Sequence, residues 1–271
     1  MTRIQEFFGD LWLDFTRMAP RAATIRDLFT ERGEEAINDH VAFRTFNLPF
    51  IGIARLERRF LDIGYEVLDE YDFPEKNLRA RSYRAQEKDA PLIFLSELLL
   101  EQIQPECRAI IEKLALQSDP AALSNPALFS SGRLWPPPSS HDYQTLLANS
   151  EYAAWVAALG FHANHFTISV NRLRKTTELR EVLDLVEDAG FTINEAGGRI
   201  KGSPQELLEQ GSTMAELVTM EFHDGEKREI PGCFYEFARR YPEKNGELFQ
   251  GFIAKSANKI FESTWTKPES P

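Results

Sequence analysis

The chain has 271 residues, of which 42% are hydrophobic and 27% are charged, and this composition is ordinary for a soluble globular protein without a long disordered region. Its formal net charge at pH 7 is −11, which argues against nucleic acid as a partner because phosphate binding needs a concentrated basic surface. The only two cysteines, Cys107 and Cys233, stand in no disulfide or metal-binding spacing, so we expect a reducing, cytoplasmic location.

The amino-terminal segment, residues 1–37, predicts two helices. Apolar residues recur at helical spacing along the first helix, at Ile4, Phe7, Phe8, Leu11 and Phe15. Acidic residues interrupt this stripe, so we expect no signal peptide, and no apolar run in the chain is long enough to span a membrane. We therefore expect the stripe to face the core, and we expect no membrane partner.

Residues 38–98 change to the pattern of strands. A β-prone stretch begins at His40, residues 52–63 predict a helix, and residues 65–67, 78–83 and 91–98 predict further strands. This segment therefore predicts a β-α-β-β-β module.

Residues 99–158 form a different zone, with helical periodicity at both ends and a Pro-rich breaker at residues 135–138. We interpret this zone as a helical insertion that joins two modules.

Residues 159–271 predict a second β-α-β-β-β module and a closing helix. A strand begins at His165, a helix follows, and further strands are predicted at residues 191–194, 217–222 and 232–237. The Gly-rich stretch 197–204 is too irregular for a strand, and residues 205–210 predict a short helix. The expected fold is α+β, with the two modules paired so that their curved sheets form an open barrel around a ligand site.

The first and last strands of each module should line that barrel, which directs attention to three side chains. His40 and His165 open the first strands, and Glu236 lies on the last strand of the second module. Two imidazoles and one carboxylate favour a divalent transition metal with open coordination positions. These residue types do not distinguish iron from zinc, nickel or manganese. A single histidine at a strand start is more often structural, but its repetition in both modules favours a ligand pair.

Several alternatives remain open for these ligands. His162 lies three residues before His165 and is its rival, and Glu221 is an alternative to Glu236. Glu97 occupies in the first module the place that Glu236 occupies in the second. It is either a fourth ligand or the acidic start of the next helix.

Arg44 lies four residues after His40, so a regular strand places both side chains on one face, roughly 13 Å apart along the strand. An arginine beside a metal is a candidate for binding a substrate carboxylate, and a surface ion pair is the alternative. Arg79, Arg81 and Lys201 are weaker candidates for binding a second acidic group.

The same segments resemble a known family. They are similar to the vicinal-oxygen-chelate (glyoxalase) superfamily and, within it, to the 2-oxoadipate dioxygenase/decarboxylase family, which includes the hydroxyglutarate synthases. The matching segments are His40-Val41-Ala42-Phe43-Arg44, Asn164-His165-Phe166-Thr167 and residues 232–240. The last segment, with residues 248–252 and 260–263, is also similar to the carboxy-terminal end of hydroxyphenylpyruvate dioxygenases.

The resemblance implies a non-haem iron enzyme. It implies that His40, His165 and Glu236 hold Fe(II) and that Arg44 binds the substrate carboxylate. The implied reaction consumes O2 and a 2-oxo acid, releases CO2 and converts 2-oxoadipate to 2-hydroxyglutarate in lysine breakdown. Two alternatives stay open, a glyoxalase-like lyase or isomerase with zinc or nickel, and a non-catalytic module that binds a small ligand.

Overall fold

The computed structural model describes residues 2–87 and 89–264. The helices are α1 (Arg3–Met18), α2 (Ala22–Glu31), α3 (Ile53–Leu56), α4 (Arg58–Asp62), α5 (Pro105–Ala115), α6 (Ser140–Asn149), α7 (Glu151–Leu159), α8 (Leu179–Asp188) and α9 (Ala254–Ile260). The strands are β1 (Asn38–Phe46), β2 (Tyr65–Phe73), β3 (Leu78–Ala85), β4 (Leu92–Leu98), β5 (Ala163–Ser169), β6 (Lys201–Ser203), β7 (Leu208–Ser212), β8 (Leu217–Glu221), β9 (Lys227–Pro231) and β10 (Phe234–Arg240).

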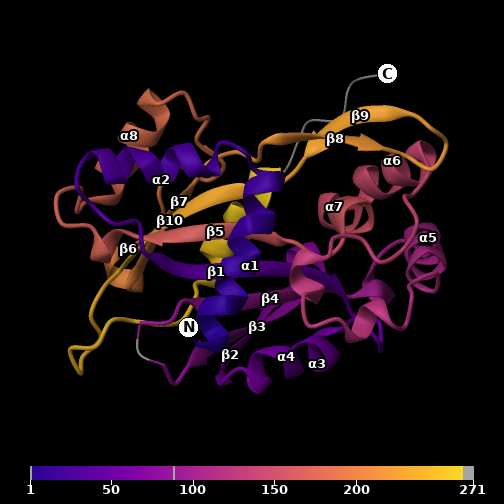
Figure 1. Ribbon diagram of the computed structural model, residues 1–271, viewed down its shortest axis with the longest axis horizontal. Coiled ribbons are helices and arrows are strands. Elements are labelled where there is room, and N and C mark those ends of the chain that lie inside the picture. The colour runs from indigo at the N-terminus through magenta and orange to yellow at the C-terminus, as the bar shows by residue number, and fades with distance from the viewer. Residues whose placement is uncertain (1, 88, 265–271) are drawn as a thin grey trace.

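Within the described residues, the strands form one eight-stranded mixed sheet and a separate two-stranded hairpin (Figure 1). The order in the large sheet is β2-β3-β4-β1-β5-β10-β7-β6, so each half contains four strands. In each half the first and last strands are parallel neighbours, β1 with β4 and β5 with β10. The two halves meet where β1 pairs antiparallel with β5. The predicted pair of β-α-β-β-β modules is confirmed.

The second module uses different middle strands from those predicted. The predicted strand at 191–194 makes only an isolated bridge, Ile193 to Thr213, and the predicted strand at 217–222 is β8, which pairs with β9 outside the large sheet. The middle strands are instead β6 and β7, from the stretch predicted to be irregular and then helical. Both are short and contain glycine, Gly202 and Gly211, so their sequence carries little β signal.

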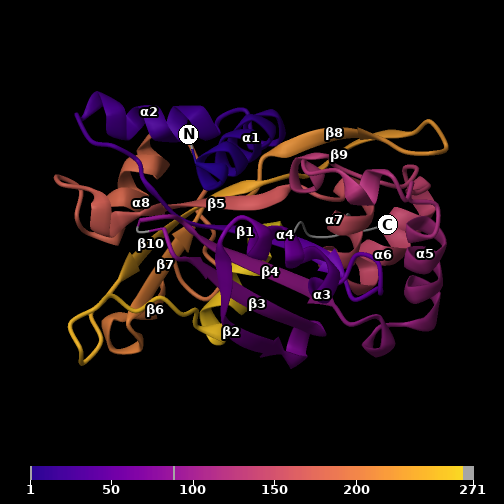
Figure 2. The same ribbon diagram turned by 60° about the horizontal axis from the view of Figure 1, so that its bottom comes forward.

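Helices cover the two faces of the large sheet. Figure 1 shows α1 in front of the sheet and the yellow helix α9 behind it, and Figure 2 shows α1 and α2 on one side with α9 on the other. Helix α1 packs on β5, whereas α9 packs on β2, β6 and β7. Helices α5, α6 and α7, from the predicted helical insertion, gather at one end of the sheet. The predicted helix at 52–63 is divided into α3 and α4.

The apolar stripe of α1 lies in the core, as predicted. Thr2 caps the helix through a capping box with Gln5, which starts α1 at Arg3. The Phe15 side chain is fully buried, and its ring centroid lies 4.9 Å from that of Phe166 on β5. The stripe therefore attaches α1 to the sheet face opposite α9. Among the described residues, none of the helices combines the length and apolar character needed to cross a membrane.

Replacing Phe15 with alanine is expected to lower the free energy of unfolding by about 3–5 kcal/mol, because a fully buried phenyl ring would leave a cavity. The matched control is Leu13→Ala on the same helix, whose side chain is 60% exposed, and it should change stability by less than about 0.5 kcal/mol. Denaturant unfolding of both variants measures the difference. Equal losses would contradict this packing of α1.

Candidate metal centre

The pairing of β1 with β5 brings the two predicted histidines together. In this antiparallel pair His40 lies opposite Thr167, and Ala42 lies opposite His165. The two imidazole centroids are therefore 5.6 Å apart although the residues belong to different modules. Both side chains are buried.

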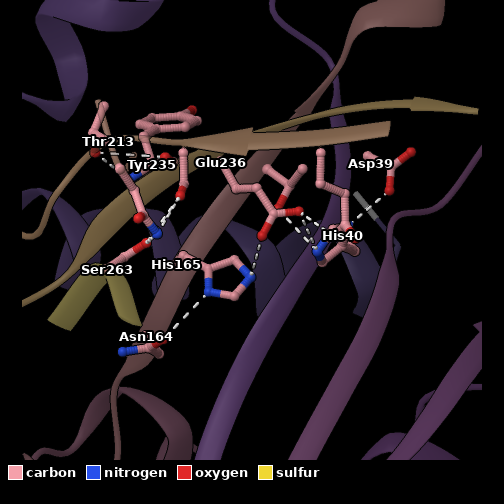
Figure 3. A network of polar contacts seen from close by, with 12 residues as sticks. Asp39, His40, Asn164, His165, Thr213, Tyr235, Glu236 and Ser263 are labelled. Atoms are coloured by element: carbon pink, nitrogen blue, oxygen red, sulfur yellow. Dashed lines mark hydrogen bonds and ion pairs between the residues drawn. The ribbon is translucent and has the colours of Figure 1, made fainter. Parts of the chain in front are cut away.

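Glu236 places its carboxylate between these two imidazoles (Figure 3). Its Oε1 lies 3.3 Å from His40 Nε2, and its Oε2 lies 3.3 Å from His165 Nε2. The side chain is fully buried, and Glu236 Oε2 has no hydrogen-bond partner among the described residues. A buried carboxylate oxygen without a donor is costly unless a cation faces it.

The protonation of the three groups is strongly coupled. Burial alone would raise the pKa of Glu236, but the charge of the His40 imidazole and hydrogen bonds from His40 and Gln210 outweigh burial and lower that pKa. Burial would likewise lower the pKa of His40, but Glu236 and Asp39 raise it. Burial lowers the pKa of His165 to about 3, so this imidazole is neutral at pH 7 and free to act as a ligand.

The three side chains fit a divalent transition metal ion. Their ligand atoms all lie within 4.8 Å of one another. Adjacent ligands on an octahedral ion with bonds of ~2.1 Å are ~3.0 Å apart, which is close to the two carboxylate–imidazole contacts. Two histidines and one carboxylate on one side of an ion leave the opposite positions open.

These open positions would face a small pocket between the two modules. The walls come from both modules and from the segment around α9, and they include Ala42, Phe94, Ser96, Phe252, Ile260 and Phe261. Most of this lining is apolar, so it excludes water from the region beside the three ligands.

Arg44 contributes a positively charged side chain to the lining of this pocket. Its side chain is 2% exposed and projects from β1 on the same face as His40. One guanidinium nitrogen, Nη1, donates to Thr264 Oγ1 at 3.0 Å, whereas Nε and Nη2 have no partner among the described residues. Burial lowers the pKa of Arg44, but an arginine stays charged at neutral pH. The free nitrogens therefore suit a carboxylate ligand.

Comparison with known proteins agrees with this geometry. A family model described as 2-oxoadipate dioxygenase/decarboxylase matches residues 16–131 and 127–247. The chain belongs to the 2-oxoadipate dioxygenase/decarboxylase family. The resemblance found in the sequence is thus confirmed, and so is the expectation that the chain is an enzyme.

Individual members of the 2-oxoadipate dioxygenase/decarboxylase family are similar along most of the chain. The protein of that name from Oryza sativa subsp. japonica, chloroplastic/amyloplastic, is 37% identical over 269 residues, which cover 90% of this chain and 74% of the relative. The chloroplastic protein of that name from Arabidopsis thaliana is 36% identical over 252 residues, which cover 84% and 68%. The crystal structure of hydroxyglutarate synthase from Oryza sativa in complex with 2-oxoadipate has a TM-score of 0.90 and 34% identity, and the match covers 96% of this chain and 91% of that one.

Glu97 does not occupy the place of Glu236. His165 lies opposite Phe234 and His40 lies opposite Leu92, so the residue that corresponds to Glu236, two positions further on, is Phe94.

Glu97 instead follows the pocket residue Ser96 and faces the other side of the sheet, because strand side chains alternate. There its carboxylate pairs with Arg79 and accepts the N–H of Ile53 at the start of α3. Glu97 is the second-last residue of β4, next to β1, and does not begin a helix.

The remaining candidates lie outside the pocket. His162 pairs with Asp14 of α1, and Glu221 is exposed and pairs with Lys227. Arg79 is half exposed, and Arg81 pairs with Glu57 and Glu70. Lys201 is buried and donates to the Asn194 carbonyl, and burial lowers its pKa to about 8.

Gln210 is a site residue that the sequence pattern does not indicate. This buried side chain lines the pocket and donates from Nε2 to Glu236 Oε1 at 2.7 Å. It lies on β7, in the stretch predicted to be helical, so no sequence signal directed it toward the barrel.

Replacing Glu236 with glutamine is expected to abolish stoichiometric metal binding, whereas Glu97→Gln should leave it unchanged, because only Glu236 faces both imidazoles. The Glu97 variant should instead lose about 1–3 kcal/mol of stability, since Arg79 and the Ile53 N–H lose a charged partner. Elemental analysis and denaturant unfolding measure the two effects. Full metal content in the Glu236 variant would refute this ligand set.

Proposed function

We propose that the enzyme catalyses the Fe(II)-dependent oxidative decarboxylation and hydroxylation of a 2-oxo dicarboxylic acid. The single observation that carries this proposal is the buried set of His40, His165 and Glu236 beside an unpaired arginine. The substrate best supported is 2-oxoadipate, because the named relatives act on it and one solved relative binds it. The balanced reaction is 2-oxoadipate + O2 → 2-hydroxyglutarate + CO2, and its place would be lysine breakdown.

Fe(II), when bound, supplies the redox chemistry for O2 and a Lewis acid for the 2-oxo group. The three ligands would hold it at the pocket floor, with Gln210 fixing the Glu236 carboxylate through a hydrogen bond. Zinc or nickel could occupy the same ligands in a purified sample.

The chain's own groups would select and orient the substrate. Arg44 offers two buried N–H groups to one substrate carboxylate, and the rings of Tyr152, Trp155 and Phe261 lie 5.1–5.5 Å from its guanidinium. These rings exclude water from the carboxylate contact, which makes the charged hydrogen bonds stronger.

The cytoplasmic location stays a prediction. The two plant relatives are named as plastid proteins, and this says nothing direct about the present chain.

Protein loaded anaerobically with Fe(II) and given 2-oxoadipate should consume O2, release CO2 and form 2-hydroxyglutarate in equal amounts. An oxygen electrode, CO2 trapping and chromatography measure the three quantities. Metal-free protein and a Zn(II)-loaded sample are the controls, since neither carries a redox-active ion. Turnover of a 2-oxoaldehyde by the zinc sample, without O2 uptake by the iron sample, would favour the glyoxalase-like alternative.

Arg44→Met is expected to raise the KM for 2-oxoadipate roughly 10- to 100-fold, the effect of losing a charge-assisted pair of hydrogen bonds in a buried site. Arg81→Met is the matched control, because Arg81 lies on β3 in an ion pair with Glu57. Steady-state kinetics at saturating O2 measure both. An unchanged KM in the Arg44 variant would exclude its role in binding the substrate.

A further inference from the structure

Each histidine of the metal centre contacts the residue that precedes it. His40 Nδ1 donates to Asp39 Oδ1 at 2.7 Å, and His165 Nδ1 donates to Asn164 Oδ1 at 3.3 Å (Figure 3). Because the Nε2 atoms face Glu236, Nδ1 is in both cases the nitrogen left to fix the ring. The duplicated modules therefore share this contact, but the acceptor is a carboxylate in one and a neutral amide in the other.

Asp39 is itself held by Arg240, the last residue of β10. Arg240 donates from Nε to Asp39 Oδ2 and from Nη2 to Asp39 Oδ1, each at 2.8 Å. This is a bidentate pair, and both side chains are buried, at 5% and 6% exposure. Arg240 therefore fixes both oxygens of the acceptor of His40.

The same guanidinium fixes the chain that covers His40. Arg240 Nη1 donates to the carbonyls of Phe249 and Gly251, each at 2.9 Å. The next residue, Phe252, places its ring edge-on to the His40 imidazole, with 4.8 Å between centroids, and lines the pocket. One side chain thus holds both the acceptor of His40 and the segment packed against its ring.

We propose that Asp39 and Arg240 are positioning residues of the metal centre. Arg240 fixes the carboxylate of Asp39, and Asp39 holds the His40 imidazole with Nε2 directed at the metal. A carboxylate on the second nitrogen also increases the basicity of a histidine ligand, and such partners change metal affinity about 10- to 100-fold. This inference rests on the proposed metal site.

A role in stability alone does not account for this arrangement. A buried ion pair contributes little more than an apolar pair of the same shape, because both charges must be desolvated. The pair is nevertheless placed on the one free nitrogen of a metal ligand and on the backbone beside the pocket. These contacts orient the imidazole in a way that apolar side chains could not.

The test uses Co(II) as a spectroscopic probe in the full chain. Asp39→Asn and Arg240→Met should each weaken Co(II) binding about 10- to 100-fold in a chelator competition, and both should alter the visible Co(II) bands. The double variant should lose clearly less affinity than the two single losses added together, because Arg240 acts in part through Asp39. The matched control is Arg239→Met, since the neighbouring Arg239 pairs with Glu178 away from the site. It should stay within about twofold of wild type.

The outcomes separate this inference from the metal site itself. If wild type and His40→Ala bind Co(II) equally, or if neither binds it, the proposed metal site is wrong and the proposed function is contradicted. If only wild type binds, but folded Asp39→Asn keeps wild-type affinity and spectrum, the positioning role is overturned and the metal site stands. Should Arg240→Met fail to fold, Arg240→Lys replaces it, because lysine keeps the charge without the bidentate geometry. A loss of Co(II) affinity in Arg240→Lys that is smaller than the loss in Asp39→Asn supports the proposal. An unchanged affinity in Arg240→Lys overturns it.

Discussion

The antiparallel pairing of β1 with β5 is the contact on which the site depends. It joins two four-stranded halves into one sheet, and its register places His40 and His165 within reach of one carboxylate. A shift of one residue in this register would turn one histidine to the opposite face of the sheet, because strand side chains alternate. The core on the α1 face opposes such a shift, since Phe166, which follows His165, is packed against Phe15. Packing on the α1 face of the sheet therefore fixes the positions of His40 and His165 on the other face.

The duplication supplies two similar halves, but the site itself is asymmetric. Glu236 corresponds to Phe94 in the first module, and Arg44 corresponds to Ser169 in the second. The second module thus provides two of the three proposed ligands, and the first provides the cation. This division gives one proposed metal site, rather than two, where the modules meet. Phe94 lines the pocket where a symmetric pair of modules would place a second buried carboxylate.

The pocket concentrates groups that are costly to bury without partners. Glu236 Oε2, two nitrogens of Arg44, Asn164 Nδ2 and Gln210 Oε1 are buried without a hydrogen bond among the described residues. Native proteins contain few such atoms, so their gathering in one apolar cavity indicates a place prepared for a charged ligand. By contrast, the buried carboxylate of Glu97 is satisfied by Arg79 and the Ile53 N–H.

Local patterns were sufficient for the parts of the fold with strong periodicity. The stripe of α1, the strand at His40 and the repeat at His165 are all visible in the sequence, because burial on one face imposes a period that a single chain displays. Strands β6 and β7 were missed because they are short, contain glycine and owe their extended form to neighbours in the sheet. Because β7 was not predicted as a strand, Gln210 was not predicted to face the pocket.

By itself the sequence determined the fold class, the pairing of two modules and the residue types of the site, since His40, His165 and Glu236 are chemically distinctive at their strand positions. Only the tertiary structure decided that Phe94, not Glu97, corresponds to Glu236, and that His162 pairs with Asp14. The physical reason is strand register. Which face a side chain takes depends on hydrogen bonds between segments far apart in the chain, and no local pattern reports those bonds.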